Sequence, residues 1–279
     1  MLSKFLPPDF DPSATIALIA GKGAYPKVLA KKLASFGVKT KLAAFEDETD
    51  ADLLDSFADG DKAVMNIGQL GKLLKTVKNF GAKYAIMAGQ ITPKKLFKGL
   101  KPDLKALSVL LTLKERNAET IFGAIAAQLS KIGCELLDAR SFLDEYIAPK
   151  GFFCGKKWSV KPEHLEHAMR IARELARLDV GQSCVASKGS ILAAEAFEGT
   201  DKMIERAGTF EAADSLFAKT VKPDQDYRFD VPVIGERTLR KLAAANIKNG
   251  AVESGSVIIL EPAKVRALAE QNGIKIFGV

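Results

Sequence analysis

Short apolar runs alternate with helical segments through the first third of the chain, and this alternation limits the fold more than any other feature of the sequence. Segments with helical spacing, such as residues 25–37 and 69–81, separate the apolar runs. Strands that alternate with helices form parallel sheets with right-handed crossovers. The sequence therefore predicts an α/β fold that begins with a parallel sheet. Its four predicted strands are residues 15–20, 39–45, 63–68 and 84–89.

Residues from 92 to about 147 are predicted to be mainly helical, and a different pattern of strands and helices follows them. Residues 148–162 hold several prolines and glycines, and we interpret them as a linker. Two predicted strands at 180–187 and 191–197 are joined by a turn short enough for an antiparallel hairpin. We therefore predict two domains, a parallel-sheet domain over residues 1–150 and a mixed α+β domain over 151–279. Its other predicted elements are helices at 163–178 and 236–246, a helix after residue 201, strands near 216–221 and 250–260, and a final helix and strand.

Composition and charge narrow the class of protein. The chain has 279 residues, 47% of them hydrophobic, which is enough for substantial cores. A net charge of +7 favours anionic partners such as phosphates, nucleic acid or a lipid surface. The three cysteines, Cys134, Cys154 and Cys184, lie far apart with no Cys-x-x-Cys pair, which favours a reducing cytosol over a disulfide framework or a thiolate zinc site. No segment reaches the roughly 20 apolar residues of a membrane span, so we expect a cytoplasmic protein.

Two further segments each admit two interpretations. Residues 94–116 carry six lysines and one arginine among many leucines. They form either crossover helices with a solvated basic side or an amphipathic surface that meets anionic lipid. His164 and His167 lie three residues apart on a predicted helix. That spacing allows a metal, but no third ligand follows, so a solvated helix face is favoured.

A glycine turn follows the first predicted strand. Gly21 and Gly23 lie between a strand and a helix N-terminus, where backbone N–H groups can meet a phosphate. Glu46 lies about where the ribose-binding acid of a dinucleotide site would be. However, Pro26 replaces the third glycine that normally lets helix and strand pack closely. The alternatives are a nucleotide contact, an NAD-dependent oxidoreductase, or a tight turn with no ligand.

A second turn precedes the helix predicted after residue 201. Gly199, Thr200 and Asp201 form a turn that can cap this helix. Glu198 and Arg206 add ionisable groups close to it. A turn that opens a helix also binds phosphate, so capping and phosphate binding are both open.

Residues 222–230 hold five charged side chains within nine positions. As an extended strand, this stretch would place Asp226, Arg228 and Asp230 on one face. The two carboxylates suit Mg²⁺, or one of them suits a general base, while Arg228 and nearby Lys222 suit phosphate oxygens. The alternatives are metal-assisted attack of water on a phosphorus and a surface strand with one salt bridge.

Four motifs occur in an order that resembles a known family. With the terminal GIKIFGV, they resemble the UDP-2,3-diacylglucosamine pyrophosphatases of the LpxI type over nearly the whole chain. The run Q-D-x-R-x-D-x-P-x-x-G and the E-G-T-D turn are specific when they occur together. The motifs are IAGKGAYP at 19–26, LDVGQS at 178–183, EAFEGTDKMIERA at 195–207 and KPDQDYRFDVPVIGERT at 222–238.

The resemblance implies a fold and a reaction. It implies a Rossmann-like N-terminal domain and a distinct C-terminal domain, with substrate between them. The implied reaction hydrolyses UDP-2,3-diacylglucosamine to 2,3-diacylglucosamine 1-phosphate and UMP with Mg²⁺, as a step of lipid A synthesis. The family's catalytic aspartate corresponds to Asp230, with Asp226 as the second carboxylate and both as metal ligands.

The same resemblance sets the expected contacts. Gly21 and Gly23 would approach the nucleotide, and Lys222 and Arg228 would hold the diphosphate. The partners expected are the acylated UDP-sugar, the inner-membrane surface as a peripheral site, and a homodimer. Nucleic acid is not expected, since the cations are scattered and few aromatics accompany them. The remaining expected substrate contacts are Gln182, Glu198, Gly199, Thr200 and Asp201.

The chain departs from the family pattern at two places. GQITPKK at 89–95 replaces an Arg-Pro element, and KERNAETIFGAI at 114–125 replaces a Gly-Asp-Asp-like element. Both departures lie outside the C-terminal motifs, so they bear on nucleotide and sugar contacts more than on the reaction.

Overall fold

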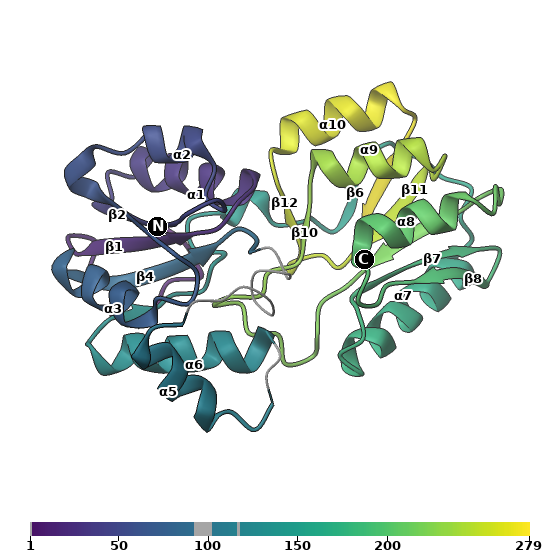
Figure 1. Cartoon of the computed structure of the whole chain (residues 1–279). Helices are drawn as coiled ribbons and strands as arrows, with labels where there is room; N and C mark the ends of the chain where they lie inside the picture. The colour runs from purple at the N-terminus through teal and green to yellow at the C-terminus, as the bar shows by residue number, and fades with distance from the viewer. Residues whose placement is uncertain (1, 92–101, 116–117) are drawn as a thin grey trace. The chain divides into compact units, whose positions relative to one another are not determined.

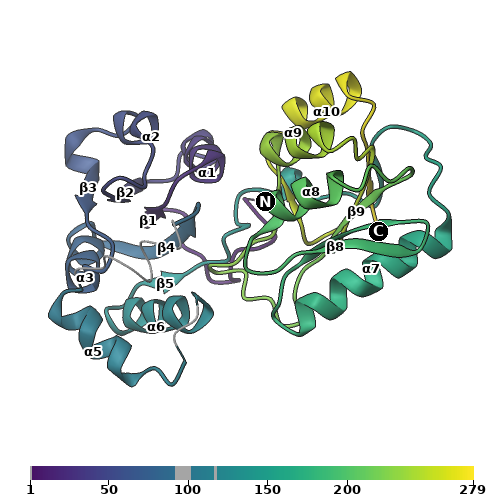
Figure 2. The same ribbon diagram turned by 45° about the vertical axis from the view of Figure 1, so that its right-hand side comes forward.

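The chain folds into two compact units. The computed structural model describes residues 2–91, 102–115 and 118–279. The first unit comprises Met1–Asp144 and Asp226–Asp230, and the second comprises Glu145–Gln225 and Val231–Val279. Each unit has its own central sheet with helices on both faces (Figures 1 and 2). A short segment from the C-terminal half thus belongs to the first unit.

The first unit contains a five-stranded sheet in the order β3-β2-β1-β4-β5, and every pairing in it is parallel. These are the first five positions of the Rossmann strand order. The predicted α/β fold with a Rossmann-like parallel sheet is confirmed. The strands are β1 (Thr15–Ala20), β2 (Thr40–Phe45), β3 (Lys62–Met65), β4 (Ala82–Ala88) and β5 (Glu135–Leu136).

Alternate side chains of these strands feed two apolar layers. Ala17 and Ile19 of β1 join the cluster on the face that three of the helices cover, while Ile16 and Leu18 are buried on the other face. The α-helices that the structure describes in this unit therefore divide between the two faces of the sheet (Figure 2). They are α1 (Ala24–Ser35) and α2 (Ala51–Asp55) on one face, and α3 (Leu70–Asn79), α5 (Leu104–Thr112) and α6 (Ala118–Lys131) on the other.

The second unit contains a six-stranded mixed sheet in the order β6-β13-β11-β9-β7-β8. Its three central pairing partners β13, β11 and β9 are parallel, and the flanking strands are antiparallel. The predicted mixed α+β domain, including its hairpin, is confirmed. The strands are β6 (Gly151–Cys154), β7 (Ser183–Ser187), β8 (Ser190–Ala194), β9 (Leu216–Lys219), β11 (Asn249–Val252) and β13 (Lys275–Gly278), with a separate parallel pair β10 (Val233–Ile234) and β12 (Ile258–Ile259).

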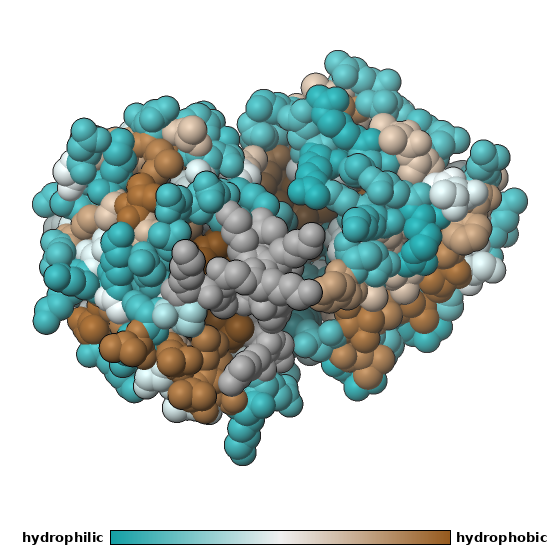
Figure 3. Space-filling view, viewed as in Figure 1, coloured by the Kyte–Doolittle hydropathy of each residue, from teal (hydrophilic) through white to brown (hydrophobic). Residues whose placement is uncertain are grey.

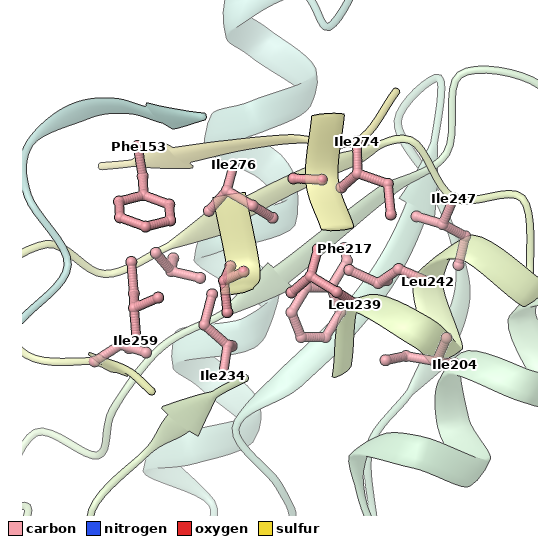
Figure 4. Packing of buried hydrophobic residues seen from close by; sticks show 14 of the residues in the cluster. Phe153, Ile204, Phe217, Ile234, Leu239, Leu242, Ile247, Ile259, Ile274 and Ile276 are labelled. Atoms are coloured by element: carbon pink, nitrogen blue, oxygen red, sulfur yellow. The ribbon is translucent and has the colours of Figure 1, made fainter. Parts of the chain in front are cut away.

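Two apolar layers also hold the second unit together. Cys184 and Leu216 join the layer that contains buried residues of α7 (Pro162–Arg177). Phe217 and Ile276 point to the opposite side, where Figure 4 shows them packed with Leu239 and other aliphatic side chains. That side is covered by α8 (Thr200–Gly208), α9 (Glu236–Ala244) and α10 (Pro262–Gln271). None of the helices that the structure describes has the length and apolar content needed to cross a membrane.

The predicted linker at residues 148–162 is wrong. Within it, β6 pairs antiparallel with β13, and Phe152 is the register partner of Phe277. Phe153 and Cys154 are buried. The apolar run gains its strand partner from the far end of the chain, so the flanking prolines and glycines were a poor guide to its conformation.

We expect the three cysteines to resist alkylation in the folded protein. All three are buried and unpaired. Burial raises the pKa of the Cys134 and Cys184 thiols to about 12, and the thiolate is the reactive form. Intact mass after iodoacetamide treatment near neutral pH should show no added groups, whereas denaturant should allow three. Rapid alkylation of the folded chain would contradict this burial.

Candidate functional sites at the strand ends

The carboxyl edge of the first sheet is the natural place for a ligand. In doubly wound sheets, ligands bind outside the carboxyl ends of the strands where the strand order reverses. Here the order reverses between β1 and β4. Lys22 and Gln90, just beyond these strands, pair through two backbone hydrogen bonds of 2.9 and 3.0 Å. The glycine turn therefore lies at the switch point of the sheet.

The two glycines of this turn have different reasons to be glycine. A Cβ on Gly21 would lie 2.4 Å from the carbonyl oxygen of Gln90, so the close approach of the two backbones requires glycine there. Gly23 has φ +101° and open space around it, and its N–H donates to Asp50 Oδ2 at 3.4 Å. The Asp50 carboxylate also pairs with Lys27 at 2.7 Å. The Gly23 N–H, which a dinucleotide site would offer to a phosphate, is therefore engaged by a carboxylate of the protein.

Residues 226–230 form a turn, so the predicted extended strand is wrong. The N–H groups of Phe229 and Asp230 both donate to the carbonyl of Asp226, at 3.3 and 3.1 Å. Asp226 Oδ1 also accepts the N–H of Arg228 at 3.1 Å. Short acidic side chains that bind the backbone two residues ahead favour turns over strands. The Asp226 side chain and carbonyl therefore stabilise the turn conformation of residues 226–230.

The Asp226 carboxylate is committed to Arg228. Arg228 Nε donates to both carboxylate oxygens, and Nη2 donates to Oδ2 at 2.6 Å. These hydrogen bonds lower the pKa of Asp226, which makes it a weak base at neutral pH. The Arg228 side chain remains 49% exposed, so its charge is available to an anion.

A second turn of the same design lies beside the first. Asp138 Oδ1 accepts the N–H of Arg140 at 2.8 Å, and Arg140 Nη2 donates to Asp138 Oδ2 at 2.6 Å. The N–H of Ala139 donates to the carbonyl of Tyr227 at 2.8 Å. The Arg140 guanidinium carbon lies 3.3 Å from the ring centre of Tyr227 and 4.3 Å from that of Phe5. The Arg140 guanidinium and the hydrogen bond from Ala139 to Tyr227 thus join the turn at 138–140 to the turn at 226–228.

These contacts place the 226–230 turn at the carboxyl edge of the first sheet. Ala139 follows β5, and its carbonyl accepts the hydroxyl of Tyr25, at the start of α1. Burial raises the pKa of Tyr25, so its hydroxyl stays protonated as a donor. Phe229 stacks on Phe122 with ring centres 5.9 Å apart and packs against the core cluster of the sheet. Two predicted groups, the glycine turn and residues 226–230, therefore lie at one edge of one unit.

The donor set at this edge fits Mg²⁺ only in part. Proteins hold Mg²⁺ through one or two carboxylates together with waters and substrate phosphates. Within the described ranges, no group of three His, Cys, Asp or Glu side chains is arranged to hold a metal. Arg228 binds both oxygens of Asp226, and Asp230, the other carboxylate of the turn, is half-buried.

In the second unit, a different polar cluster lies where β7 begins beside the ends of β8 and β9. Ser183 is the register partner of Lys219, and its carbonyl accepts the N–H of Glu195 at 2.9 Å. The Glu195 carboxylate accepts the hydroxyl of Ser183 at 2.5 Å and that of Thr200 at 2.7 Å. It also accepts the N–H of Gln182 at 3.4 Å. Glu195 therefore organises the end of the sheet.

Lys219 is a buried cation in this cluster. It is 7% exposed, and its Nζ donates to Thr200 Oγ1 at 3.1 Å. In the part of the chain that the structure describes, no ion pair joins it to a carboxylate. Thr200 opens α8, whose N-cap Gly199 has φ +81° and no side chain to cap the first turn. Lys219 thus places a buried positive charge beside this helix N-terminus, and the Glu195 carboxylate on Thr200 and Asp201 in the first turn offset part of it.

The other predicted residues of the second unit are bound within the protein. Arg206 donates to Glu198 at 2.6 Å and lowers its pKa, and Arg237 binds Asp201. Gln225 Oε1 accepts Gln182 Nε2 at 3.2 Å and the N–H of Lys222 at 2.9 Å. Lys222 Nζ also pairs with Asp179. Gln182 and Lys222 are thus brought together.

Several sequence predictions fall elsewhere. His164 lines a cavity of about 350 Å³ with Lys161, Lys188 and Asp214, while His167 contacts Arg170 at 2.9 Å. Residues 92–95 of GQITPKK, the lysines at 94–101, and residues 116–117 lie outside the described residues. The KERNAETIFGAI departure contributes Phe122, which stacks on Phe229.

Sequence reasoning missed Glu195 and Lys219. Glu195 opens the EAFEGTD motif but stands four residues before the glycine that drew attention. Lys219 ends the otherwise apolar run LFAK. The available signal for Lys219 was a charged residue at the end of an apolar run that predicts a buried strand.

These two units, with polar clusters at their strand ends, define a two-domain α/β protein, and two family models that together match most of the chain show that it belongs to the LpxI family. The family's N-terminal domain model matches residues 15–146, and its C-terminal domain model matches residues 149–277. The chain is also 31% identical over 281 residues to UDP-2,3-diacylglucosamine pyrophosphatase LpxI of Caulobacter vibrioides. That match covers 95% of this chain and 97% of the relative. The family that the motifs indicated is confirmed.

Proposed function

We propose that the protein hydrolyses the diphosphate of UDP-2,3-diacylglucosamine and releases 2,3-diacylglucosamine 1-phosphate and UMP, a step of lipid A synthesis. Family membership and the full-length match to a relative named for this substrate support the proposal. The structural observation that carries it is the D-Y-R-F-D turn at the carboxyl edge of a Rossmann-like sheet, where such sheets bind ligands.

Each residue of the turn has a distinct proposed role. Asp230 would hold the metal or accept a proton from the attacking water. The water oxygen bonds to one phosphorus while the bridging P–O bond breaks. Arg228 binds phosphate oxygens, and Asp226 holds its guanidinium in place. Mg²⁺, when bound, supplies charge neutralisation on the diphosphate and lowers the pKa of water.

The cluster of the second unit is proposed to hold an anionic group of the substrate. Lys219 supplies a buried positive charge, and the first turn of α8 supplies backbone N–H groups. Glu195 fixes the Thr200 hydroxyl so that it accepts from Lys219. We propose a cytoplasmic enzyme that meets its lipid substrate at the membrane surface.

The test is direct hydrolysis. Purified protein with detergent-dispersed UDP-2,3-diacylglucosamine and Mg²⁺ should release UMP, which chromatography measures. UDP-glucose serves as a control that lacks the acyl chains. Failure to release UMP from the acylated substrate would refute the proposed reaction.

Metal removal tests the cofactor separately. We expect EDTA to abolish UMP release and excess Mg²⁺ to restore it, because a bound Mg²⁺ would neutralise negative charge on the diphosphate. Full activity in EDTA would leave the reaction in place and remove Mg²⁺ from it.

Replacing Arg140 should loosen the 226–230 turn. Arg140→Ala removes the guanidinium between Phe5 and Tyr227, so we expect kcat to fall about tenfold with a smaller change in KM. Arg140→Lys keeps the charge but not the planar stacking, and it should recover only part of kcat. Hydrogen exchange at residues 226–230 should rise in parallel. Unchanged exchange with lost activity would show that Arg140 acts in another way.

A further inference from the structure

A cavity lies in the second unit where α7 begins beside the turn between β7 and β8. Its volume is about 350 Å³, a size that takes a small molecule. Figures 1 and 2 draw α7 on one face of the second sheet and α8 on the other. Figure 3 shows hydrophobic residues gathered on the part of the second unit where Figure 1 draws α7 and β8. Apolar side chains therefore also reach the surface on this side of the unit.

The floor of the cavity is apolar and lies away from the Lys219 cluster. Ala186 of β7 and Leu216 of β9 are register partners, are each 2% exposed, and line the cavity. Both belong to the apolar layer of α7, whereas Lys219 binds Thr200 of α8 on the other face. Leu216 and Lys219 also stand at opposite ends of β9, about 10 Å apart along the strand. The cavity is therefore a separate site, on the other face and at the other end of the sheet.

Two lysines from different elements line this cavity. Lys161 is the N-cap residue of α7, Lys188 lies in the turn between β7 and β8, and both are exposed. In the part of the chain that the structure describes, neither lysine has a carboxylate partner. Among the described lining residues, one carboxylate, that of Asp214, offsets part of their charge and accepts the hydroxyl of Ser159 at 2.9 Å. Positive charge above an apolar floor suits an anion with an apolar body.

The turn between β7 and β8 does not itself call for a lysine. Lys188 and Gly189 are the two residues of this hairpin turn, and their φ angles are +48° and +84°. Such a turn needs positive φ at both positions and favours asparagine or aspartate before the glycine. A lysine in the left-handed region is less favourable than asparagine. Turn formation therefore leaves Lys188 unexplained, whereas an anion in the adjacent cavity would explain its charge.

We propose that this cavity binds a small organic phosphate, with the phosphate between Lys161 and Lys188 and the apolar body on Ala186 and Leu216. A phosphate fits better than a carboxylate, because two ammonium groups then meet a dianion. Lysine binds phosphate as a point charge and does not need the planar geometry with which arginine binds a carboxylate. The site is distinct from the proposed hydrolytic one and does not depend on that function.

The two histidines of the chain provide a local probe of binding. His164 lines the cavity, and its Cδ2 would lie 3.6 Å from a Cβ on Gly189. His167 contacts Arg170 at 2.9 Å and is not among the described residues that line the cavity. Protein made with isotope-labelled histidine therefore gives two ring signals in NMR spectra, which a His167→Gln variant assigns. Phenyl phosphate, added without substrate at constant pH and ionic strength, should shift the His164 signal to saturation and leave the His167 signal in place.

Matched lysine substitutions test the charge. Lys188→Asn removes the ammonium group and places a favoured residue in the turn, so binding of phenyl phosphate should weaken about tenfold while the melting temperature stays equal or rises. Lys161→Gln should weaken binding by a similar factor. Lys156→Asn removes an exposed lysine of the same unit that is not among the described lining residues, and it should leave the affinity unchanged. Unchanged affinity in a folded Lys188→Asn protein overturns the inference.

Two further ligands test the chemistry of the site. Inorganic phosphate lacks the apolar body and benzoate carries one charge fewer, so each should bind about tenfold more weakly than phenyl phosphate. Equal affinity for inorganic phosphate would reduce the cavity to a pair of surface lysines, and equal affinity for benzoate would refute the assignment to phosphate. Either result overturns the inference, as does a His164 signal that phenyl phosphate does not move.

Discussion

Asp230→Asn should lower kcat by about a hundred- to ten-thousandfold while thermal melting stays close to that of wild type. The substitution keeps the size of the side chain and removes only its charge, so the turn closed by backbone bonds to Asp226 should persist. A metal ligand or base acts mainly in the transition state, whereas uridine and acyl contacts act on the bound substrate as well. KM should therefore change much less than kcat.

Two other aspartates of the same segment serve as controls for this result. Asp224 is exposed and two positions before Asp226, so Asp224→Asn should leave both kcat and stability near wild type. Asp226→Asn should release Arg228 and lower kcat and substrate affinity together, by less than Asp230→Asn lowers kcat. UMP release measured beside thermal melting distinguishes these patterns. A normally active Asp230→Asn enzyme would end the proposed mechanism and leave the turn with a structural salt bridge alone.

Four of the five strands of the first sheet were predictable because their signal is local, whereas the two-residue β5 was missed. TIALIA and its neighbours are apolar runs bounded by turn residues, and the alternation with helices fixed the parallel topology. β6 was missed for the opposite reason. Gly151–Cys154 is a strand because β13, more than a hundred residues later, pairs with it, and nothing beside it in the sequence announces that partner.

The chemistry of the 226–230 segment was predictable, but its geometry was not. Composition alone identified two carboxylates flanking an arginine. The alternation of charged and apolar residues then predicted a strand. In the structure, the Asp226 side chain accepts a backbone N–H of a turn, and Arg140, from another part of the chain, packs on the ring of Tyr227. The sequence holds the clue twice, as D-A-R at 138–140 and D-Y-R at 226–228, but only the structure brings the two turns together.

The burial of Lys219 is the feature that its position in the sequence predicts least well. A lysine at the end of a strand normally extends its charge into water, yet this one is 7% exposed. Burying an ammonium group costs free energy unless a charge or several hydrogen bonds compensate it, and the Thr200 hydroxyl offers one hydrogen bond. The proposed anion would supply the compensation that this single hydrogen bond does not.

Lys219→Met should therefore separate function from stability. Methionine fills similar volume without charge, so we expect the melting temperature to stay equal or rise, as when a poorly compensated buried charge is removed. Hydrolysis should suffer, since a hydrogen bond from a charged donor contributes about 1.5–3 kcal/mol, or about ten- to hundredfold in kcat/KM. Lys275→Met, on β13 of the same sheet, is the matched control and should keep kcat/KM. If Lys219→Met instead melts several degrees lower and hydrolyses substrate normally, Lys219 is a structural lysine and the anion site at α8 does not exist.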